Sequence, residues 1–483
     1  MANKQEKADV IIIGAGPAGY PCAIRLAQLG KKVTVIEKGN LGGVCLNVGC
    51  IPSKALIHCG TLYEKIQHAG EFGFEIQGVN VNIKKMMEHK DKVVNRMTTG
   101  VGGLLKANGC TVVNGTATLT GPTTLTVQTD AGPVDYTFNH CVIATGSRPT
   151  PFPGLEVDQK TVWDSTGALS QDTIPGSLLC IGGGYIGLEL GTFYAKIGAK
   201  VTVVEAAPSL LGMVEPELAK VVEKKLKATG ADIRVGTFVK DPKVTSKGVE
   251  VTLEKDGKTE TAIFEKALVT IGRKPNIEGI GLEAAGVRMD DHGFVAVNPQ
   301  RQTNIPTIFA IGDIAGQPLL AHKGTKEGIV AAEVIAGKAS AYDIISMPAV
   351  IFTDPEIATV GMTEKEASNA GFEVLTGAFP FAANGKAVSI GEPDGLVKMV
   401  ADKKTGKLLG VHIVGPEASN LISEAALALE MGSYVEDIAL TIHPHPTLGE
   451  TMMEAAEATL GHAIHIFQRK ANPPKAPNAQ ANA

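Results

Sequence analysis

Two cysteines stand five residues apart in the glycine-rich stretch GGVCLNVGC, residues 42–50. Along an ideal α-helix this spacing separates the Cα atoms of Cys45 and Cys50 by roughly 7.5 Å, whereas a disulfide tolerates about 4.4–6.8 Å. If the two cysteines bridge, the segment must therefore be a distorted turn, for which the neighbouring glycines supply the backbone freedom. Closing so short a loop adds little stability, which favours a redox role over a structural one.

A second chemical motif, HPHPTLGE, lies near the other end of the chain at residues 443–450. It carries His443, His445 and Glu450, and its two prolines restrict the backbone between them. Imidazole titrates near the working pH, so it can accept a thiol proton and return it. A carboxylate beside the ring would fix its tautomer and stabilise the imidazolium. The motif thus offers a candidate general base for thiol chemistry.

The other cysteines do not form a second short-spaced cluster. A zinc site would need a further pair of cysteines or histidines at short spacing, and Cys59 next to His58 is the nearest candidate. The remaining cysteines occur in apolar contexts that predict buried core positions: Cys22, Cys110, Cys141 and Cys180. We therefore predict no metal site.

The stretch DVIIIGAGPAGYPCAIRLAQLGKKVTVIEK predicts a nucleotide-binding βαβ unit. An apolar strand at residues 10–13 runs into a turn with Gly14, Gly16 and Gly19; a helix follows, and a second strand ends at Glu37. The glycines permit a tight turn and close approach of the backbone to a pyrophosphate, which the helix N-terminus then faces. The carboxylate at the strand end is placed to bind ribose hydroxyls.

The unit recurs in SLLCIGGGYIGLELGTFYAKIGAKVTVVE, where Gly182, Gly184 and Gly187 take the glycine positions and Glu205 that of the acid. In both copies the acid lies 23 residues after the first glycine. Two dinucleotide sites in one chain indicate an enzyme that passes electrons between two nucleotides. A carboxylate at Glu205 would repel the 2′-phosphate of NADP, so the second site favours NAD.

Three further segments help to delimit domains. The stretch TNIPTIFAIGDIAG, residues 303–316, predicts a strand that delivers Gly312 and Asp313 to a turn. This turn suits a flavin's ribityl or phosphate oxygens, although it equally fits a strand that ends in an aspartate cap. ATGSRP at 144–149 and VTIGRKPN at 269–276 predict the exits from the two nucleotide-binding units. They place domain boundaries near residues 150 and 278.

Composition narrows the class of protein. A chain of 483 residues is too long for one core, and 44% hydrophobic with 20% charged residues is typical of a globular protein. The net charge of −5 without a Lys/Arg-rich run argues against a nucleic-acid partner. No apolar run approaches the length of a membrane span, and the polar start has no signal-peptide core. Seven cysteines, an odd number, favour a reducing compartment, so we predict a cytoplasmic enzyme.

In their order along the chain, the motifs resemble those of the FAD-dependent pyridine nucleotide-disulfide oxidoreductases, and within them the dihydrolipoamide dehydrogenases. The resemblance covers about residues 8–468 and is carried most specifically by GGVCLNVGCIPSK and HPHPTLGE. It implies an α/β fold with two Rossmann-like dinucleotide-binding domains, a central domain and a C-terminal α+β dimerisation domain. The implied segments are an FAD-binding domain with a redox-active disulfide at 1–150, an NAD-binding domain at 151–278, a central domain completing the FAD site at 279–348, the dimerisation domain at 349–468 and a disordered tail at 469–483.

The resemblance also assigns roles to single residues of the first motif. Cys45 and Cys50 match the redox-active pair, with Cys45 exchanging with substrate and Cys50 facing the flavin. Lys54 follows Cys50 by about one helical turn and so shares its face. In the family this lysine lies near the flavin and pairs with a glutamate, matched here by Glu189.

In the second motif, His445 matches the family's base and Glu450 its partner. The resemblance implies that this pair acts on the disulfide of the other subunit of a homodimer, and that the proline after the base is cis. It leaves His443 a structural role. The family commonly has alanine where this chain has Pro444, which leaves the conformation of the loop open.

Contacts to the two cofactors are implied at the motif positions and at a few residues outside them. For FAD they are Gly14, Gly16, Gly19, Glu37, Gly43, Lys54, Gly115, Asp313 and Ala321. For NAD they are Gly182, Gly184, Tyr185, Ile186, Gly187, Glu205, Val239 and Gly272. Some relatives have a tyrosine at the position of Tyr185 that gates the nicotinamide pocket and others a small aliphatic residue, so gating is left open.

The implied activity is oxidation of protein-bound dihydrolipoamide to lipoamide through the Cys45–Cys50 disulfide and FAD, with reduction of NAD+. The lipoyl group would arrive on a lipoyl domain of a 2-oxoacid dehydrogenase or glycine-cleavage complex. Two alternatives remain: a related FAD disulfide reductase acting on a small thiol such as glutathione, and a non-catalytic flavin-binding subunit. Glu205 argues against the first, and the intact catalytic set against the second.

Overall fold

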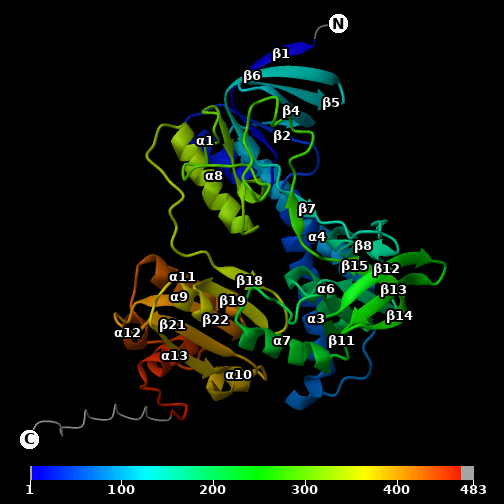
Figure 1. Ribbon diagram of the computed structural model, residues 1–483, viewed down its shortest axis with the longest axis vertical. Coiled ribbons are helices and arrows are strands. Elements are labelled where there is room, and N and C mark those ends of the chain that lie inside the picture. The colour runs from blue at the N-terminus through cyan, green and yellow to red at the C-terminus, as the bar shows by residue number, and fades with distance from the viewer. Residues whose placement is uncertain (1–2, 469–483) are drawn as a thin grey trace, which may run out of the picture. The chain divides into compact units, whose positions relative to one another are not determined.

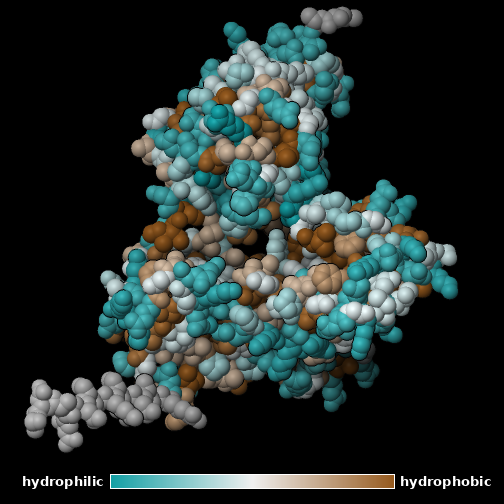
Figure 2. Space-filling view, viewed as in Figure 1, coloured by the Kyte–Doolittle hydropathy of each residue, from teal (hydrophilic) through white to brown (hydrophobic). Residues whose placement is uncertain are grey.

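The computed structural model describes residues 3–468, so the expected tail at 469–483 lies outside the described residues. The described residues form two compact units, one of residues 3–212 with 223–344 and one of residues 213–222 with 345–468. Hydrophilic and apolar side chains are interspersed on the surface (Figure 2). None of the described helices is long and apolar enough to cross a membrane.

The first unit contains a seven-stranded sheet of order β3-β2-β1-β6-β5-β4, in which β17 also pairs with β6 (Figure 1). Its pairs β1·β2, β2·β3, β1·β6 and β6·β17 are parallel, whereas β4 and β5 add an antiparallel extension. The strands are β1 Lys4–Ile13, β2 Val33–Glu37, β3 Thr111–Asn114, β4 Thr116–Gly121, β5 Thr124–Thr129, β6 Gly132–Ile143 and β17 Ile308–Ala310.

Helices from distant parts of the chain pack around this sheet, and α1 lies beside α8 (Figure 1). They are α1 Gly19–Gln28, α2 Gly43–Val48, α4 Ile83–Ala107 and α8 Ala321–Ile335, with the short 3₁₀ helix η2 Gly312–Ala315. Helix α3, Cys50–Gln67, contacts α2 and α4 rather than the strands, and the 3₁₀ helix η1, Ala69–Phe72, contacts α3. Because α8 and β17 come almost three hundred residues after α1, the first nucleotide-binding unit is completed by a late segment of the chain.

Strand β1 explains the apolar run at its end. Alternate residues of 10–13 pack in two different core clusters, because successive side chains of a strand point to opposite faces of the sheet. A strand covered on both faces therefore needs an unbroken apolar run. The strand begins earlier than the apolar run predicts, at Lys4, since the polar residues 4–7 pair with β6 through their main chain.

A second, parallel sheet of order β11-β10-β9-β15-β8 forms the other nucleotide-binding unit. Its strands are β8 Val162–Trp163, β9 Ser177–Ile181, β10 Lys200–Glu205, β11 Asp232–Val235 and β15 Lys266–Val269, with the helices α5 Ser165–Ala168 and α6 Tyr185–Lys196. An antiparallel three-stranded sheet packs on it, made of β12 Phe238–Thr245, β13 Gly248–Lys255 and β14 Lys258–Phe264.

The two predicted exits pair with one another. Strand β7, Ser147–Pro149, follows the first exit, and strand β16, Arg273–Pro275, follows the second. They form an antiparallel two-stranded ribbon in which Ser147 faces Pro275 across the register. The ends of both nucleotide-binding units therefore meet in one small element.

The second unit is an antiparallel sheet of order β18-β19-β22-β21-β20 with helices packed on it (Figure 1). All eight residues of β22 are buried, which suits a central strand. The strands are β18 Ala349–Ile351, β19 Glu356–Gly361, β20 Val374–Pro380, β21 Leu396–Asp402 and β22 Leu408–Gly415. The helices are α9 Glu364–Asn369, η3 Phe381–Ala383, α10 Gly385–Ser389, α11 Ala418–Glu430, α12 Val435–Leu440 and α13 Glu450–Leu460.

Helix α7, Pro216–Ala228, begins within the segment 213–222 that clusters with the second unit. Inside that unit, Lys398 is buried and pairs with Glu217 and Glu364 at 2.8 Å each and with Glu215 at 3.6 Å. Three carboxylates around one buried ammonium compensate its desolvation. This cluster explains why a segment so distant in sequence packs against β21.

Candidate functional site

The first glycine turn leaves no room for larger residues. A Cβ on Gly14 would lie 2.4 Å from the carbonyl oxygen of Ala144, and one on Gly19 would lie 2.0 Å from that of Gly14. Gly14 also has a φ of +103°, a conformation that side chains rarely adopt. A Cβ on Gly43 would lie 2.7 Å from the Cα of Gly16, so the start of the cysteine motif comes directly onto this turn.

The second glycine turn repeats the first. A Cβ on Gly182 would lie 2.6 Å from the carbonyl oxygen of Thr270, and one on Gly187 would lie 2.4 Å from that of Gly182. Gly182 has a φ of +106°, and α6 begins directly after Gly184. In both units a helix N-terminus therefore opens at the carboxyl end of the first strand, where its N–H groups can meet a pyrophosphate.

The two acids of the repeat have matching geometry. Glu37 accepts hydrogen bonds from the amides of Ala15 at 2.7 Å and Gly39 at 2.8 Å. Glu205 accepts them from the amides of Gly183 and Ala207, both at 2.7 Å. Each carboxylate is thus fixed beside its glycine turn. Two glycine cradles with an oriented acid at each fit two dinucleotides.

The other predicted cofactor contacts lie at the ends of elements. On the FAD side, Gly115 joins β3 to β4, Asp313 stands in η2 after β17, and Ala321 begins α8. A Cβ on Gly115 would lie 2.5 Å from the carbonyl oxygen of Gln128, so this position too requires glycine.

On the NAD side, Tyr185 and Ile186 begin α6 and are half-buried. Val239 lies in β12, and Gly272 precedes β16 with a φ of +123°. Their contacts to a cofactor remain predictions.

The cysteine motif spans two helices rather than one turn. Cys45 lies in α2, Cys50 begins α3, and the break between them is at Gly49, whose φ and ψ are −140° and −115°. A Cβ on Gly49 would lie 2.9 Å from the carbonyl oxygen of Val44. The distortion that the spacing predicts is thus concentrated in one glycine. The four other cysteines predicted in the core are buried.

Both cysteines of the motif are free thiols, and their side chains hydrogen-bond to each other. Cys45 is half-buried and Cys50 exposed. The hydrogen bond from Cys45 and the positive charge of Lys54 outweigh burial and lower the pKa of Cys50 to about 7. The same hydrogen bond, together with burial, raises the pKa of Cys45. Cys50 is therefore the sulfur that carries the thiolate near neutral pH.

A salt bridge joins the two nucleotide-binding units beside this thiolate. Lys54 on α3 lies 2.7 Å from Glu189 on α6, and the Glu189 side chain is almost fully buried. Tyr185 stands one turn before Glu189 on the same helix. Burial and the charges of Asp313, Glu189 and Cys50 raise the pKa of Tyr185, against the charge of Arg273. These residues therefore gather in one neighbourhood.

Replacing Lys54 with methionine is expected to raise the pKa of Cys50 by about one unit, because loss of a neighbouring positive charge disfavours the thiolate. Above its pKa the Cys50 thiolate predominates, so the variant needs a higher pH for the same thiolate fraction. The rate at which iodoacetamide alkylates Cys50 in the reduced protein, located by mass spectrometry and followed against pH, measures this shift.

Lys196→Met is the matched control. Lys196 on α6 pairs at 2.7 Å with Glu64 on α3, so it bridges the same two helices as Lys54 does. Its removal should leave the alkylation profile of Cys50 unchanged. Coincident profiles for Lys54→Met and the unmodified chain would contradict the role of Lys54.

The predicted base and its partner meet in the second unit. His445 Nδ1 lies 2.8 Å from Glu450 Oε1, and the Thr447 amide donates to Glu450 Oε2 at 2.8 Å. Burial acts to raise the pKa of Glu450, but these two hydrogen bonds outweigh it and lower the pKa, so the carboxylate is ionised. The His445 side chain is 78% exposed, and its Nε2 is the ring nitrogen that could receive a proton from outside.

The loop around the base is fixed by local hydrogen bonds. His443, whose side chain is buried, lies 2.9 Å from both Glu424 and the carbonyl oxygen of Thr441, and the Glu424 bond raises its pKa. The Thr447 hydroxyl donates to the carbonyl oxygen of Pro444 at 2.7 Å. The peptide bond before Pro446 is cis. The proline at 444 is thus accommodated in an ordered loop.

Sequence reasoning missed Thr447, whose amide binds the partner carboxylate. The T-x-x-E spacing from Thr447 to Glu450 is the only sequence signal for it; it resembles a capping box, although α13 begins at Glu450 itself and Thr447 lies before its N-cap. Ser147 and Arg273, which bond to one another beside Asp313, were also missed.

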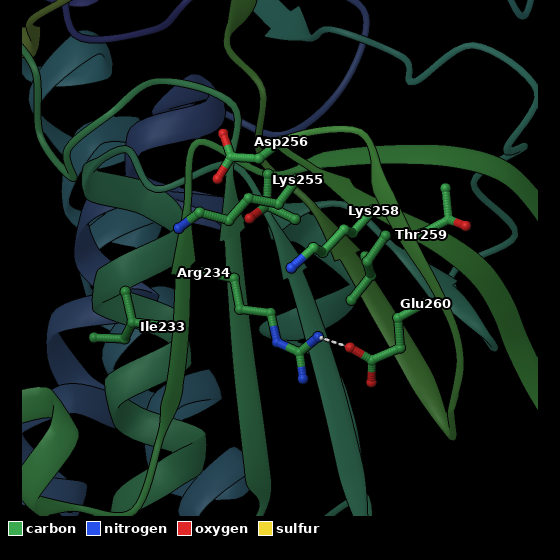
Figure 3. Close-up of a pocket in the computed structure, with 9 residues that line it drawn as sticks. Ile233, Arg234, Lys255, Asp256, Lys258, Thr259 and Glu260 are labelled. Atoms are coloured by element: carbon green, nitrogen blue, oxygen red, sulfur yellow. Dashed lines mark hydrogen bonds and ion pairs between the residues drawn. The ribbon is translucent and has the colours of Figure 1, made fainter.

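A separate cavity of about 360 Å³ opens on the antiparallel sheet of the second nucleotide-binding unit (Figure 3). Its lining includes Arg234 of β11 with Lys255 and Lys258 at the turn between β13 and β14. Arg234 is already bonded at 2.7 Å to both Asp232 and Glu260. None of the predicted site residues lines this cavity.

Comparison with known protein families decides the class. The profile described as "Pyridine nucleotide-disulphide oxidoreductase" matches residues 8–328, and its dimerisation domain matches residues 347–456. The chain belongs to the pyridine nucleotide-disulphide oxidoreductase family. Membership confirms the predicted α/β fold class with a C-terminal dimerisation domain. FAD and the nicotinamide dinucleotide are the cofactors of this family.

Curated relatives in this oxidoreductase family extend over nearly the whole chain. A dihydrolipoyl dehydrogenase from Geobacillus stearothermophilus is 48% identical over 461 residues, which cover 95% of this chain and 98% of the relative. One from Bacillus subtilis is 46% identical over 461 residues, with the same coverage. The resemblance to dihydrolipoamide dehydrogenases that the motifs indicated is thereby confirmed.

Solved structures also match the fold of this chain. LpdA from Mycobacterium tuberculosis superposes with a TM-score of 0.87 at 27% identity and covers 93% of this chain and 99% of its own. The HOCl-induced flavoprotein disulfide reductase RclA from Escherichia coli superposes with a TM-score of 0.82 at 26% identity, covering 93% and 99%. The fold is therefore shared with LpdA and with a flavoprotein disulfide reductase.

Proposed function

We propose that this chain is a dihydrolipoyl dehydrogenase, which oxidises protein-bound dihydrolipoamide to lipoamide and reduces NAD+. The observation that carries the proposal is the meeting, within one unit, of a reactive cysteine pair and two glycine cradles of matching geometry. The names of the relatives favour this activity over a glutathione-type reductase or a non-catalytic flavin-binding subunit.

The residues that would hold the cofactors are those of the two cradles and the positions near them. For FAD they are Gly14, Gly16, Gly19, Glu37, Gly43, Lys54, Gly115, Asp313 and Ala321; for NAD they are Gly182, Gly184, Tyr185, Ile186, Gly187, Glu205, Val239 and Gly272. When bound, FAD supplies the relay that takes two electrons from the cysteine pair and delivers them as hydride to NAD+.

The chain's own residues would perform the thiol chemistry. With Cys45 and Cys50 oxidised to a disulfide, His445 takes a proton from one substrate thiol, and the resulting thiolate attacks Cys45. The Cys45–Cys50 bond breaks, and Cys50 leaves as the thiolate that Lys54 stabilises. The second substrate thiol then displaces Cys45 and gives its proton to the departing Cys45 sulfur, whose pKa is raised. This closes the lipoamide ring and leaves both cysteines reduced, as in the described structure.

His445 would be the base because its carboxylate partner is already in place. Glu450 is ionised and bound to Nδ1, so it fixes the tautomer with Nε2 as acceptor and stabilises the imidazolium that forms. The exposed ring suits a base that serves a site formed with another subunit. The Lys54–Glu189 ion pair would fix the surroundings of Cys50, and neither residue would transfer a proton.

A homodimer is the assembly that this arrangement requires. The second unit, whose segment matches the dimerisation domain, exposes large apolar side chains: Leu440 and Ile442 lie shortly before the base in the sequence, and Ile464 and Phe467 follow α13. Such side chains are commonly buried in an interface. The base of one subunit would then serve the disulfide of the other, and the reduced lipoyl group would come from a partner's lipoyl domain in the cytoplasm.

We assign the segments accordingly: FAD-binding at 1–150, NAD-binding at 151–278, the segment completing the FAD site at 279–348, and dimerisation at 349–468. The pairing of β17 with β6 supports the return of the third segment to the first, and the pairing of β16 with β7 joins the second segment to the first.

The direct test is turnover of the purified holoenzyme with dihydrolipoamide. We expect NAD+ reduction, a bound flavin extractable as FAD at one per chain, and little use of NADP+. Glutathione disulfide with NADPH is the comparison substrate pair. Faster turnover of that pair, or extraction of FMN or no flavin, would contradict the proposal.

The nucleotide preference gives this test a variant arm. Glu205→Arg should weaken NAD+ use and improve NADP+ use, because a repulsive carboxylate becomes a partner for the 2′-phosphate. Glu37→Arg changes the equivalent acid of the other cradle and should leave the ratio of NAD+ to NADP+ use unaltered. An equal change for both nucleotides in Glu205→Arg would show that Glu205 is not the ribose ligand.

A further inference from the structure

The side chain of Asp313, a predicted flavin contact, is held by the ribbon of β7 and β16 that joins the two nucleotide-binding units. The Ser147 hydroxyl lies 2.5 Å from Asp313 Oδ2, and Ser147 is only 2% exposed. Arg273, on the strand that pairs with that of Ser147, approaches Ser147 twice: its Nε lies 2.8 Å from the hydroxyl oxygen and its Nη2 2.8 Å from the carbonyl oxygen. The three side chains thus form one chain of hydrogen bonds.

The direction of this chain is fixed by chemistry. A guanidinium can only donate, so the Ser147 oxygen must accept from Arg273 and direct its own hydrogen to Asp313. The two bonds to one residue also hold the planar guanidinium in a single orientation. Oδ2 of Asp313 therefore accepts the hydrogen bond from Ser147. Oδ1 is then the carboxylate oxygen that can accept a hydrogen bond from a ligand hydroxyl.

The backbone of the same turn is held from the other side. The amide of Gly312 donates to Glu327 Oε2 at 2.7 Å, and Glu327 is fully buried. Arg301 at 2.8 Å and Lys323 at 3.1 Å from Glu327 Oε1 neutralise this buried carboxylate. The backbone of the turn is therefore fixed by Glu327 of α8. The Asp313 carboxylate, in contrast, is oriented by the ribbon of β7 and β16.

Arg273 also borders the predicted nicotinamide side. Gly272, a predicted NAD contact, directly precedes it in sequence. The charge of Arg273 acts on the Tyr185 hydroxyl, as do the charges of Asp313 and Glu189, so all three groups lie within electrostatic reach of Tyr185. The hydrogen-bond chain therefore runs from the predicted NAD-binding segment to the predicted FAD-binding turn.

We propose that Ser147 and Arg273 are positioning residues for FAD: Arg273 locks the Ser147 hydroxyl as a donor to Asp313, so that Asp313 presents one oriented oxygen to a hydroxyl of the cofactor. This inference rests on the proposed function, because it requires FAD in the first cradle. It makes a residue of the second nucleotide-binding unit a determinant of how tightly the first cofactor is held.

The test is a double-mutant cycle on the rate of FAD release from diluted holoenzyme, followed by the rise in flavin fluorescence. Ser147→Ala should release FAD about tenfold faster, the size expected for loss of a hydrogen bond to a charged group. Arg273→Met should act in the same direction by severalfold. The double variant should release FAD no faster than Ser147→Ala, because Arg273 acts through Ser147. Arg273→Lys, which keeps the charge but not the fork, should fall between wild type and Arg273→Met.

Thr118→Val is the matched control. The Thr118 hydroxyl donates to the carbonyl oxygen of Gly279 at 3.0 Å, so its loss removes a hydrogen bond between distant segments of the same unit without touching Asp313. It should release FAD at the wild-type rate. Effects of Ser147→Ala and Arg273→Met that multiply in the double variant, or wild-type rates in both, would overturn the inference. A chain purified without FAD would instead overturn the proposed function, so the two failures are distinguishable.

Discussion

The Cys50→Ser variant is expected to lose dihydrolipoamide oxidation by about a thousandfold or more, while it still binds FAD and oxidises NADH with an artificial electron acceptor. The expected loss is large because serine cannot form the disulfide that receives electrons from the substrate. The remaining activity is expected because both glycine cradles lie outside the substitution and use only backbone and acid groups.

Comparison of the two activities in one preparation measures this separation. Cys59→Ser is the control, since Cys59 lies on the same helix α3, is half-buried and belongs to neither cradle. It should retain both activities. If Cys50→Ser kept substantial turnover of dihydrolipoamide, electrons would not pass through the cysteine pair, and the assignment of the disulfide would be wrong.

Mixed dimers of Cys50→Ser and His445→Gln should recover up to about half of wild-type activity, by counting sites, although each variant alone is nearly inactive. In such a heterodimer, one site combines the intact cysteines of the His445→Gln subunit with the intact base of the Cys50→Ser subunit. The other site carries both defects. Recovery therefore requires that base and disulfide come from different subunits.

The heterodimer is isolated with two different affinity tags, and its activity is compared with that of both parent homodimers. Bound flavin and dimer mass are measured on the same sample. His443→Gln is the control for the His445 substitution, because the His443 side chain is buried against Glu424 whereas that of His445 is exposed. A flavin-loaded heterodimer without activity would show that base and disulfide belong to one chain, and would leave the oxidoreductase assignment standing.

Local sequence alone determined the two nucleotide-binding units. In each unit the glycine turn and the acid are set by interactions within about 25 residues. A Cβ at Gly19 or Gly187 would collide with the carbonyl oxygen of Gly14 or Gly182, and each acid accepts a hydrogen bond from an amide of its own turn. The buried cysteines were likewise predictable from their apolar neighbours. The roles of Lys54 and of His445 were inferred from the resemblance, and their contacts with Glu189 and Glu450 are present in the structure.

Only the tertiary structure decided how the remaining residues act. The spacing of the cysteines predicts a distorted turn, yet the chain forms two helices with the distortion confined to Gly49. Ser147, Arg273 and Asp313 lie in three separate segments and carry no spacing that could link them, and they meet because β7 pairs with β16 beside the turn after β17. A hydrogen bond between residues more than a hundred positions apart depends on how the whole chain closes its sheets, and no local pattern of residues encodes that closure.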